Sequence, residues 1–407
     1  MDFKSLKDMD VEGKIVLLRA DLNVPTDGAG TGADGTEITD TTRIDRLKDT
    51  IDFLVQNGAK TLILSHFGRP KGVSPEFSLQ FMVPALEKSW GTKVEFAMDC
   101  VGSEAEKARE SLKNGDVVLM ENVRFHPEEE KNDVGFARQL AALGDIYCND
   151  AFSAAHRAHA STEGLAHFLP SCAGFLMEAE LNALNNALES PTRPVLAIVG
   201  GSKVSTKISV LENLVKKVDY LFLGGGMQNT FFYAQGIEVG KSLCEKDMAD
   251  EARRIMDAAK AAKCQIILPI DRVVVEQFAP GAKFEVVAAA HMPSDREAVD
   301  VGPASIAKLR EILAQCKTVL WNGPLGVFEV KPFDQGTNAA AMAVAEFTKN
   351  GTIISVAGGG DTVAALDHAG CLDQFSYVST AGGAFLEWME GKPLPGVVAL
   401  CAQKKAA

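Results

Sequence analysis

The sequence predicts an α/β protein built from two doubly wound parallel sheets, one in each half of the chain. Three observations lead to this prediction. The chain has 407 residues, which is more than one hydrophobic core usually supports. Short apolar runs alternate with stretches of helical periodicity, and this pattern fills both halves of the chain. Continuous apolar runs that alternate with helices are typical of buried parallel strands.

The first half contains four clear apolar runs. They are IVLL (15–18), TLIL (61–64), VVLM (117–120) and IYC (146–148). Between the first two, the segment 43–57 predicts a helix, because its apolar residues recur on one face. Asp40 or Thr41 can cap its start, and Gly58 can end it.

The second half repeats the pattern. Its predicted strands are VLAIV (195–199), YLFL (220–223), QIIL (265–268), TVLW (318–321), TIISV (352–356) and FSYVS (375–379). A helical segment over 176–190 separates the halves, and the two prolines of SPTRP (190–194) end it. We therefore expect two Rossmann-like domains, 1–175 and 191–390, joined by the helix 176–190 and a hinge.

Composition narrows the possible functions. The net charge of −13 argues against a nucleic-acid partner, and the chain lacks the run of about 18 apolar residues that a membrane span needs. The N-terminus has no apolar stretch typical of a secretory signal, which favours a cytoplasmic protein. The eight cysteines include no CxxC pair, so we expect reduced thiols and no zinc site.

Basic residues gather where the predicted strands of the first half end. In open parallel sheets, ligands bind beyond the carboxyl ends of the strands. The segments there are RADLNVP (19–25), SHFGRP (65–70), ENVRFHP (121–127) and NDAFSAAHRAH (149–159). They contain Arg19, Arg69, Arg124 and Arg157, and Arg43 begins the first predicted helix. Any one arginine could form a surface ion pair, but five together favour a site for a phosphate or carboxylate.

Other polar residues accompany these arginines. Asp21 and Asn23 either hold substrate hydroxyls or order a turn. The histidines of these segments, His66, His156 and His159, either act as acid–base catalysts or form hydrogen bonds. We favour hydrogen bonding, because a carboxylate nucleophile is already ionised near neutral pH and needs no base.

Glycine-rich turns mark the strand ends of the second half. They are GGSKVSTK (200–207), LGGGMQNTF (223–231), WNGPLGVFE (321–329), AGGGDT (357–362) and STAGGA (379–384). Tight packing explains any one of them, but the set favours a site for nucleotide phosphates at helix N-termini. Lys203 and Lys207, four residues apart, are predicted on one helix face, and Asp361 is the candidate Mg²⁺ ligand.

Several known nucleotide-binding patterns are missing from the sequence. It contains no GxxxxGK[ST] and no HRD…DFG set, and its glycine clusters fail the GxGxxG pattern. The residues thus predict an arginine-rich anion site in one domain and a lysine- and glycine-rich phosphate site in the other. By themselves they do not identify the substrate.

These motifs, together with EWMEGKPLPG (387–396), resemble the phosphoglycerate kinases of the bacterial type over essentially the whole chain. The resemblance implies a monomeric, cytoplasmic enzyme of glycolysis and gluconeogenesis. It would transfer a phosphoryl group reversibly from 1,3-bisphosphoglycerate to ADP, giving 3-phosphoglycerate and ATP, with Mg²⁺ on the nucleotide. We expect direct in-line transfer after hinge bending closes the domains over the substrates.

The resemblance also implies site residues. Those holding the phosphoglycerate are Asp21, Asn23, Arg43, His66, Phe67, Gly68, Arg69, Arg124 and Arg157. Those holding the nucleotide are Lys207, Asn322, Pro324, Glu329, Gly359, Gly360, Asp361 and Thr362, with Asp361 as the metal ligand. We expect Arg43, Lys203 and Lys207 to be catalytic, and the tail 391–407 to return to the first domain.

Three positions depart from the usual pattern of this family. The stretch 26–37 looks longer than the common turn and is glycine-rich, which predicts a mobile surface loop. Phe67 stands where leucine is usual, and Ala381 stands where glycine is common. Two alternative functions remain open from the residues alone: a nucleotide-cofactor dehydrogenase, and a two-domain binding protein that closes on a phosphorylated ligand without chemistry.

Overall fold

The computed structural model describes residues 2–27 and 36–402. The chain divides into two compact units: unit 1 is Met1–Leu181 with Pro393–Ala407, and unit 2 is Asn182–Lys392. Most of the predicted mobile loop, residues 28–35, lies outside the described residues. Among the described helices, none is long and apolar enough to cross a membrane.

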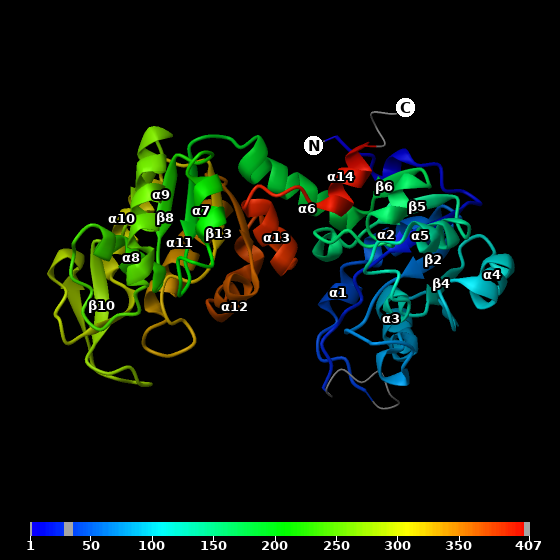
Figure 1. Cartoon of the computed structure of the whole chain (residues 1–407), viewed down its shortest axis with the longest axis horizontal. Helices are drawn as coiled ribbons and strands as arrows, with labels where there is room; N and C mark the ends of the chain where they lie inside the picture. Colours follow the sequence, from blue (N-terminus) through cyan, green and yellow to red (C-terminus); the bar gives the residue numbers. More distant parts are fainter. Residues whose placement is uncertain (1, 28–35, 403–407) are drawn as a thin grey trace. The chain divides into compact units, whose positions relative to one another are not determined.

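Unit 1 contains one six-stranded sheet in which every strand pair is parallel (Figure 1). The strands are β1 (Ile15–Arg19), β2 (Lys60–Leu64), β3 (Val94–Ala97), β4 (Val117–Met120), β5 (Ile146–Asn149) and β6 (Ser171–Ala173). Their order is β3-β4-β2-β1-β5-β6. The chain extends the sheet first on one side of β1 and then on the other, so the carboxyl end of β1 is a topological switch point, where such folds bind ligands.

Five helices of unit 1 lie between its strands in the chain, and a sixth, α14 (Pro395–Ala402), follows unit 2. The five are α1 (Thr42–Asp45), α2 (Lys48–Gln56), α3 (Val83–Trp90), α4 (Gly102–Ser111) and α5 (Val134–Ala141). The single helix predicted over 43–57 is wrong in detail, because two helices share this segment. The Asp40 carboxylate accepts a bond of 2.8 Å from the Thr42 amide, and Gly58 follows α2 with φ of +68°. Thr41 is the N-cap residue of α1 but makes no side-chain capping bond, and Asp40 instead binds the first amide of the helix.

The hydrophobic core of unit 1 lies between its sheet and its helices. β1 is buried along its whole length, and its Val16 and Leu18 belong to the same hydrophobic cluster as Ile51 and Leu54 of α2. The strands β3 and β6 were missed by the sequence prediction. β3 has an exposed and a half-buried residue between its buried ends, and β6 has three residues, so neither forms a continuous apolar run.

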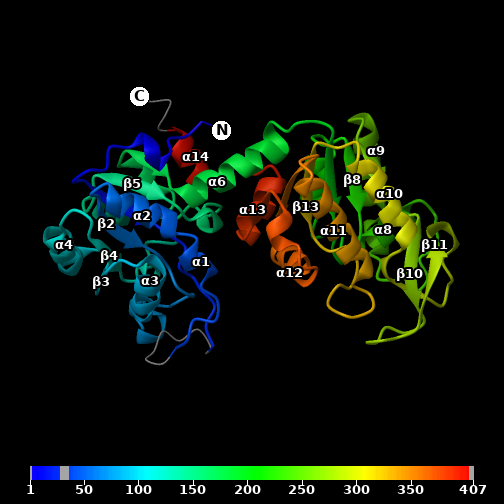
Figure 2. The same ribbon diagram turned by 180° about the vertical axis from the view of Figure 1, so that it is seen from behind.

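Unit 2 contains a second six-stranded parallel sheet (Figure 2). Its strands are β7 (Val195–Val199), β8 (Tyr220–Leu223), β9 (Gln265–Ile267), β13 (Thr318–Asn322), β14 (Ile354–Gly358) and β15 (Tyr377–Ser379). The order β15-β14-β13-β7-β8-β9 places β7 at the switch point. The prediction of two doubly wound parallel sheets is therefore confirmed.

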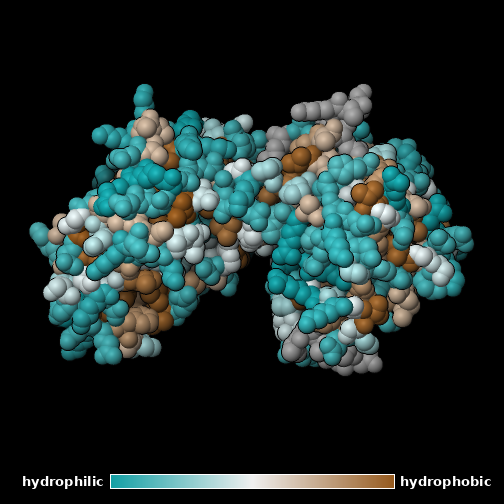
Figure 3. Space-filling view, viewed as in Figure 1, coloured by the Kyte–Doolittle hydropathy of each residue, from teal (hydrophilic) through white to brown (hydrophobic). Residues whose placement is uncertain are grey.

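A small antiparallel sheet in unit 2 was not predicted. It consists of β10 (Asp271–Val275), β11 (Phe284–Ala288) and β12 (Glu297–Val301) in the order β11-β10-β12. β11 is largely exposed, and its Phe284 and Val286 belong to the exposed hydrophobic residues of a surface that Figure 3 shows to be mostly hydrophilic. Because these strands follow one another with no α-helix between them, only a short 3-10 turn at Ala289–His291, they do not show the alternation of strand and helix on which the prediction depended.

The helices of unit 2 cover its parallel sheet. They are α7 (Ile208–Leu214), α8 (Met227–Ala234), α9 (Ala249–Ala261), α10 (Pro303–Leu313), α11 (Gln335–Lys349), α12 (Gly360–His368) and α13 (Gly382–Met389). The helix predicted over 176–190 is observed as α6 (Phe175–Leu184) followed by a π-helical turn (Asn185–Glu189). The boundary between the units falls within α6 rather than at its end.

Asp150 gives unit 1 a pH-dependent stability. Its buried carboxylate accepts bonds from the Thr50 hydroxyl (2.6 Å) and the Met177 amide (2.9 Å), and burial raises its pKa to about 6. Because the folded-state pKa lies above the unfolded value of about 3.9, this group stabilises the fold at low pH, and that contribution is lost as the pH rises through about 6.

We expect Asp150→Asn to raise the free energy of unfolding at pH 8 by up to about 3 kcal/mol, at about 1.4 kcal/mol per pKa unit. At pH 4 the two proteins should differ little. Denaturant titrations at both pH values measure this, and Asp10→Asn, whose side chain is 79% exposed, is the control. Equal effects at the two pH values would contradict this role of Asp150.

Candidate functional site

In unit 1, Asp21 and Arg43 meet at the carboxyl end of β1. The Asp21 carboxylate pairs with the Arg43 guanidinium and accepts a hydrogen bond from the Ser153 hydroxyl. Burial acts to raise the pKa of Asp21, but the nearby Arg43 charge and the hydrogen bonds outweigh burial and lower it. Asp21 is therefore ionised at neutral pH. The sequence did not single out Ser153, since nothing distinguishes it from other serines before the chain is folded.

The turn after β2 is hydrogen-bonded at Gly68 to two segments, the one that follows β1 and the one that follows β4. The Asn23 side-chain oxygen accepts a bond of 2.9 Å from the Gly68 amide, and Arg124 donates to the Gly68 carbonyl at 2.7 Å. Arg124 also pairs with Glu130 at 3.2 Å, while Arg69 is exposed at the tip of the turn. An anchored arginine, Arg124, thus lies against the turn, and an exposed one, Arg69, lies on it.

The Phe67 side chain belongs to the hydrophobic core. It is 3% exposed, and its ring centroid lies 5.1 Å from that of Phe81. Gly68 has φ of +62°, and a Cβ there would lie 2.5 Å from the Phe77 ring. These two residues therefore shape the turn by packing, and the replacement of the usual leucine by Phe67 is accommodated by neighbouring aromatic rings.

Arg19 does not join the other arginines as an exposed anion ligand. It is 1% exposed and donates to the Ser161 hydroxyl at 2.8 Å and to the Ala20 carbonyl, and it lies 3.0 Å from the His66 ring. The expectation of five converging arginines was wrong for Arg19, because a strand's last residue can point its side chain into the protein.

His66, His159, Arg124 and Arg157 lie in one neighbourhood of unit 1. Burial, and then the charge of Arg19, lower the pKa of His66 well below its usual value. Burial, and then the charge of Arg124, lower the pKa of His159 to about 4. The charge of Arg157 also lowers the pKa of both Arg124 and His159. Histidines of such low basicity are neutral at pH 7, which favours hydrogen bonding over proton transfer.

In unit 2, the switch-point loops approach each other at glycines. A Cβ on Gly200, after β7, would lie 1.9 Å from the Pro324 carbonyl oxygen. Gly323, after β13, has φ of +95°, and a Cβ there would lie 2.2 Å from the Gly200 carbonyl oxygen. Tight packing therefore explains these two glycines, and Pro324 contributes its backbone to this contact.

Lys207 lies at the N-cap of α7 and is held by Asn322. Its ammonium donates to the Asn322 side-chain oxygen, and the Asn322 amide donates to the Gly358 carbonyl at 2.6 Å. Burial lowers the pKa of Lys207, although the charge of Asp361 opposes this. The predicted helical stacking of Lys203 and Lys207 was wrong, because α7 begins at Ile208 and Lys203 lies exposed in the preceding turn.

The segment AGGGDT forms the end of β14 and the start of α12. The Thr362 hydroxyl accepts a bond of 2.7 Å from the Gly323 amide and donates to the Gly358 carbonyl at 2.8 Å. Gly359 has φ of +97°, and a Cβ there would lie 2.6 Å from the Asn322 amide nitrogen. At Gly360, a Cβ would meet no other heavy atom of the described part of unit 2 within 4 Å. The N-terminus of α12 is therefore open beside Gly360.

The structure also shows the exposure of Asp361 and Glu329 and the backbone conformation of Ala381. Asp361, in the first turn of α12, and Glu329 are both exposed. Ala381 has φ of −89°, which any residue adopts, while the neighbouring Gly382 has φ of +20°. The backbone at Ala381 therefore does not require the glycine that is common in the family.

The sequence was compared with models of known protein families. The model of the phosphoglycerate kinase family matches residues 6–392. The chain belongs to the phosphoglycerate kinase family. The predicted phosphotransferase class is thereby confirmed, and neither alternative function, dehydrogenase or non-catalytic binding protein, is supported.

Relatives and solved structures agree with the family. The chain is 58% identical to a phosphoglycerate kinase of Cereibacter sphaeroides, covering 98% of this chain and 100% of the relative. It is 59% identical to one of Ruegeria sp., with coverages of 98% and 100%. A phosphoglycerate kinase structure from Coxiella burnetii matches with a TM-score of 0.91 and 43% identity, covering 99% of this chain and 100% of that one. One from Pyrococcus horikoshii matches with a TM-score of 0.77 and 30% identity, with coverages of 99% and 100%.

Proposed function

We propose that this kinase transfers a phosphoryl group from 1,3-bisphosphoglycerate to ADP, reversibly giving 3-phosphoglycerate and ATP. The observation that carries this proposal is the Lys207 ammonium, which Asn322 holds beside the N-terminal segment of α12. A fixed cation and free helix amides together suit nucleotide phosphates. We further propose that the enzyme is a cytoplasmic monomer.

Unit 1 would bind the phosphoglycerate. Arg43 and Arg124 are held in place by Asp21 and by Gly68 and Glu130, so they offer guanidinium groups at little cost in conformational entropy. The exposed Arg69 and the half-buried Arg157 add positive charge. Asp21 and Asn23 would accept hydrogen bonds from the substrate hydroxyl, and His66 would donate or accept one as a neutral ring.

Unit 2 would bind the nucleotide. The open N-terminus of α12 would receive its phosphates at Gly359, Gly360 and Thr362, while Pro324 and Glu329 would contact the nucleoside. The exposed carboxylate of Asp361 is a hard oxygen donor of the kind that Mg²⁺ prefers, and it lies at this helix end. Bound there, Mg²⁺ would neutralise phosphate charge.

One assay tests the proposed reaction. ATP formation is measured from 1,3-bisphosphoglycerate and ADP with the full chain, with and without Mg²⁺. We expect turnover only when both substrates and the metal are present. Binding of both ligands without ATP formation would contradict the proposal.

Gly360 allows the nucleotide site to be tested separately from folding. Since a Cβ at Gly360 meets no atom of the described part of unit 2 within 4 Å, Gly360→Ala should leave thermal stability unchanged or slightly raise it. If a phosphate occupies this position, the KM for ADP should rise about tenfold or more, equal to about 1.4 kcal/mol. The KM for the phosphoglycerate is the internal control. An unchanged KM for ADP would place the phosphates elsewhere.

A further inference from the structure

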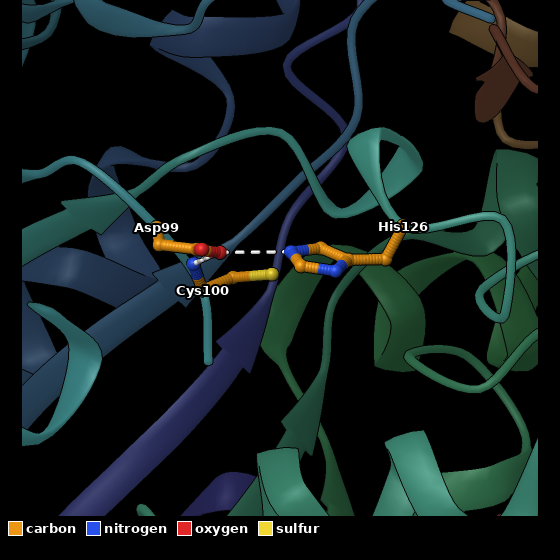
Figure 4. Close-up of side chains that lie close together, drawn as sticks. All are labelled: Asp99, Cys100 and His126. Carbon is orange, nitrogen blue, oxygen red and sulfur yellow. Dashed lines mark hydrogen bonds and ion pairs between the residues drawn. The ribbon is translucent and has the colours of Figure 1, made fainter. Parts of the chain in front are cut away.

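A carboxylate, a thiol and an imidazole lie together in unit 1, and none of the three is among the residues proposed to bind substrates. Asp99 and Cys100 lie between β3 and α4, and His126 follows β4 (Figure 4). One potential ligand atom from each residue lies within 4.8 Å of the other two. The Asp99 Oδ1 and His126 Nε2 atoms are 2.8 Å apart, and the Cys100 side chain points toward the same imidazole ring.

The two partly exposed members of this group are held in position. The His126 ring stacks on Phe136 with 5.0 Å between ring centroids and 30° between planes. The Asp99 Oδ1 atom also accepts a bond of 2.7 Å from the Cys100 amide. Ligands fixed in this way lose little entropy when a metal binds.

We propose that Asp99, Cys100 and His126 bind a divalent transition metal of the zinc class, with water as the fourth ligand. A sulfur, a nitrogen and an oxygen donor suit Zn²⁺ or Co²⁺, whereas Mg²⁺ prefers oxygen ligands alone. Tetrahedral metal–ligand bonds of about 2.0–2.3 Å place the ligand atoms roughly 3.3–3.8 Å apart. From a spacing of up to 4.8 Å, the wider pairs would have to close by up to about 1 Å, whereas the Asp99–His126 pair, at 2.8 Å, would have to open by about 0.5 Å. The sequence argued against zinc because it has no CxxC pair, and this mixed set does not need one.

The surroundings fit an open metal site. Asp99 and His126 line a cavity of about 830 Å³ together with Ser78, Glu121 and Phe125, which leaves room for a metal-bound water. Cys100 lies on the buried side, and burial, aided by the charge of Asp99, raises the pKa of its thiol well above the usual value. The thiol is therefore protonated before the metal arrives, and its proton passes to solvent when the sulfur–metal bond forms.

Cobalt is the probe that reports sulfur ligation directly. The nucleotide-free full chain is titrated with Co²⁺, and we expect a thiolate-to-cobalt charge-transfer band that saturates at one equivalent. Zn²⁺ should abolish the band, whereas an excess of Mg²⁺ should not. Absence of the band from the wild-type protein would overturn the proposal.

Variants assign the ligands. Cys100→Ser should remove the band, while Asp99→Asn and His126→Ala should weaken Co²⁺ binding by at least about tenfold. Cys244→Ser, at a half-buried cysteine of unit 2, is the control and should leave the titration unchanged. If Cys100→Ser does not fold, the other two variants still decide, since their side chains are 41% and 26% exposed. Unchanged binding in both would overturn the proposal, as would a band that depends on Cys244.

Discussion

Replacing Lys207 by alanine should lower kcat by about 10²-fold or more, the scale expected when one fixed charge-stabilising group is lost. The transferring phosphoryl group spreads negative charge over its equatorial oxygens, and we propose that Lys207 contacts those oxygens. Its ammonium is half-buried and already fixed by Asn322, so little reorganisation is needed during the reaction. Steady-state kinetics of the variant measure this effect.

Two further variants separate the effect of the Lys207 charge from the effects of lost side-chain volume and of removing a lysine elsewhere. Lys207→Met keeps much of the side-chain volume without the charge and should lose as much kcat as the alanine variant. Lys216→Ala removes an exposed lysine just beyond the other end of α7 and should leave kcat within about twofold. A rise in KM for Lys207→Ala with kcat unchanged would contradict this role. It would mean that the lysine binds the substrate no less tightly than the transition state.

Arg43→Ala should also lower kcat by about 10²-fold, because we propose that Arg43 stabilises the same developing charge from the phosphoglycerate side. Asp21 orients the guanidinium in the absence of substrate. Arg43→Lys should recover part of the activity, since it keeps the positive charge but loses the planar fork of donors. Kinetics of the two variants, with thermal melts to exclude unfolding, test this.

Arg69→Ala provides the contrast for Arg43. Arg69 is exposed, and we expect it to bind the phosphate that does not react. Its loss should raise the KM for the phosphoglycerate while kcat holds. Arg124→Ala should act in the same direction, with an added loss of stability because Gly68 and Glu130 lose a partner. If Arg69→Ala lowered kcat and Arg43→Ala did not, the two assignments would be reversed.

The two parallel sheets, and the segments that carry the candidate site, could be predicted from the sequence. Buried parallel strands need apolar side chains on both faces, so β1 and β7 are recognisable as continuous apolar runs. The residues after such strands must lie at one edge of the sheet. For that reason Asp21 and Asp361 could be proposed from their positions after strands, whereas Asn322 was implied by the family resemblance.

The contacts of individual side chains could not be predicted from the sequence, because they depend on how the chain folds. Arg19 and Arg43 look alike in the sequence, but one lies within the protein against Ser161 and the other pairs with Asp21 at the surface. Likewise, Gly200 is needed for close backbone packing, whereas Gly360 is open. Such differences depend on atoms brought together from distant segments, as at Asp99, Cys100 and His126, and local sequence patterns do not encode those distances.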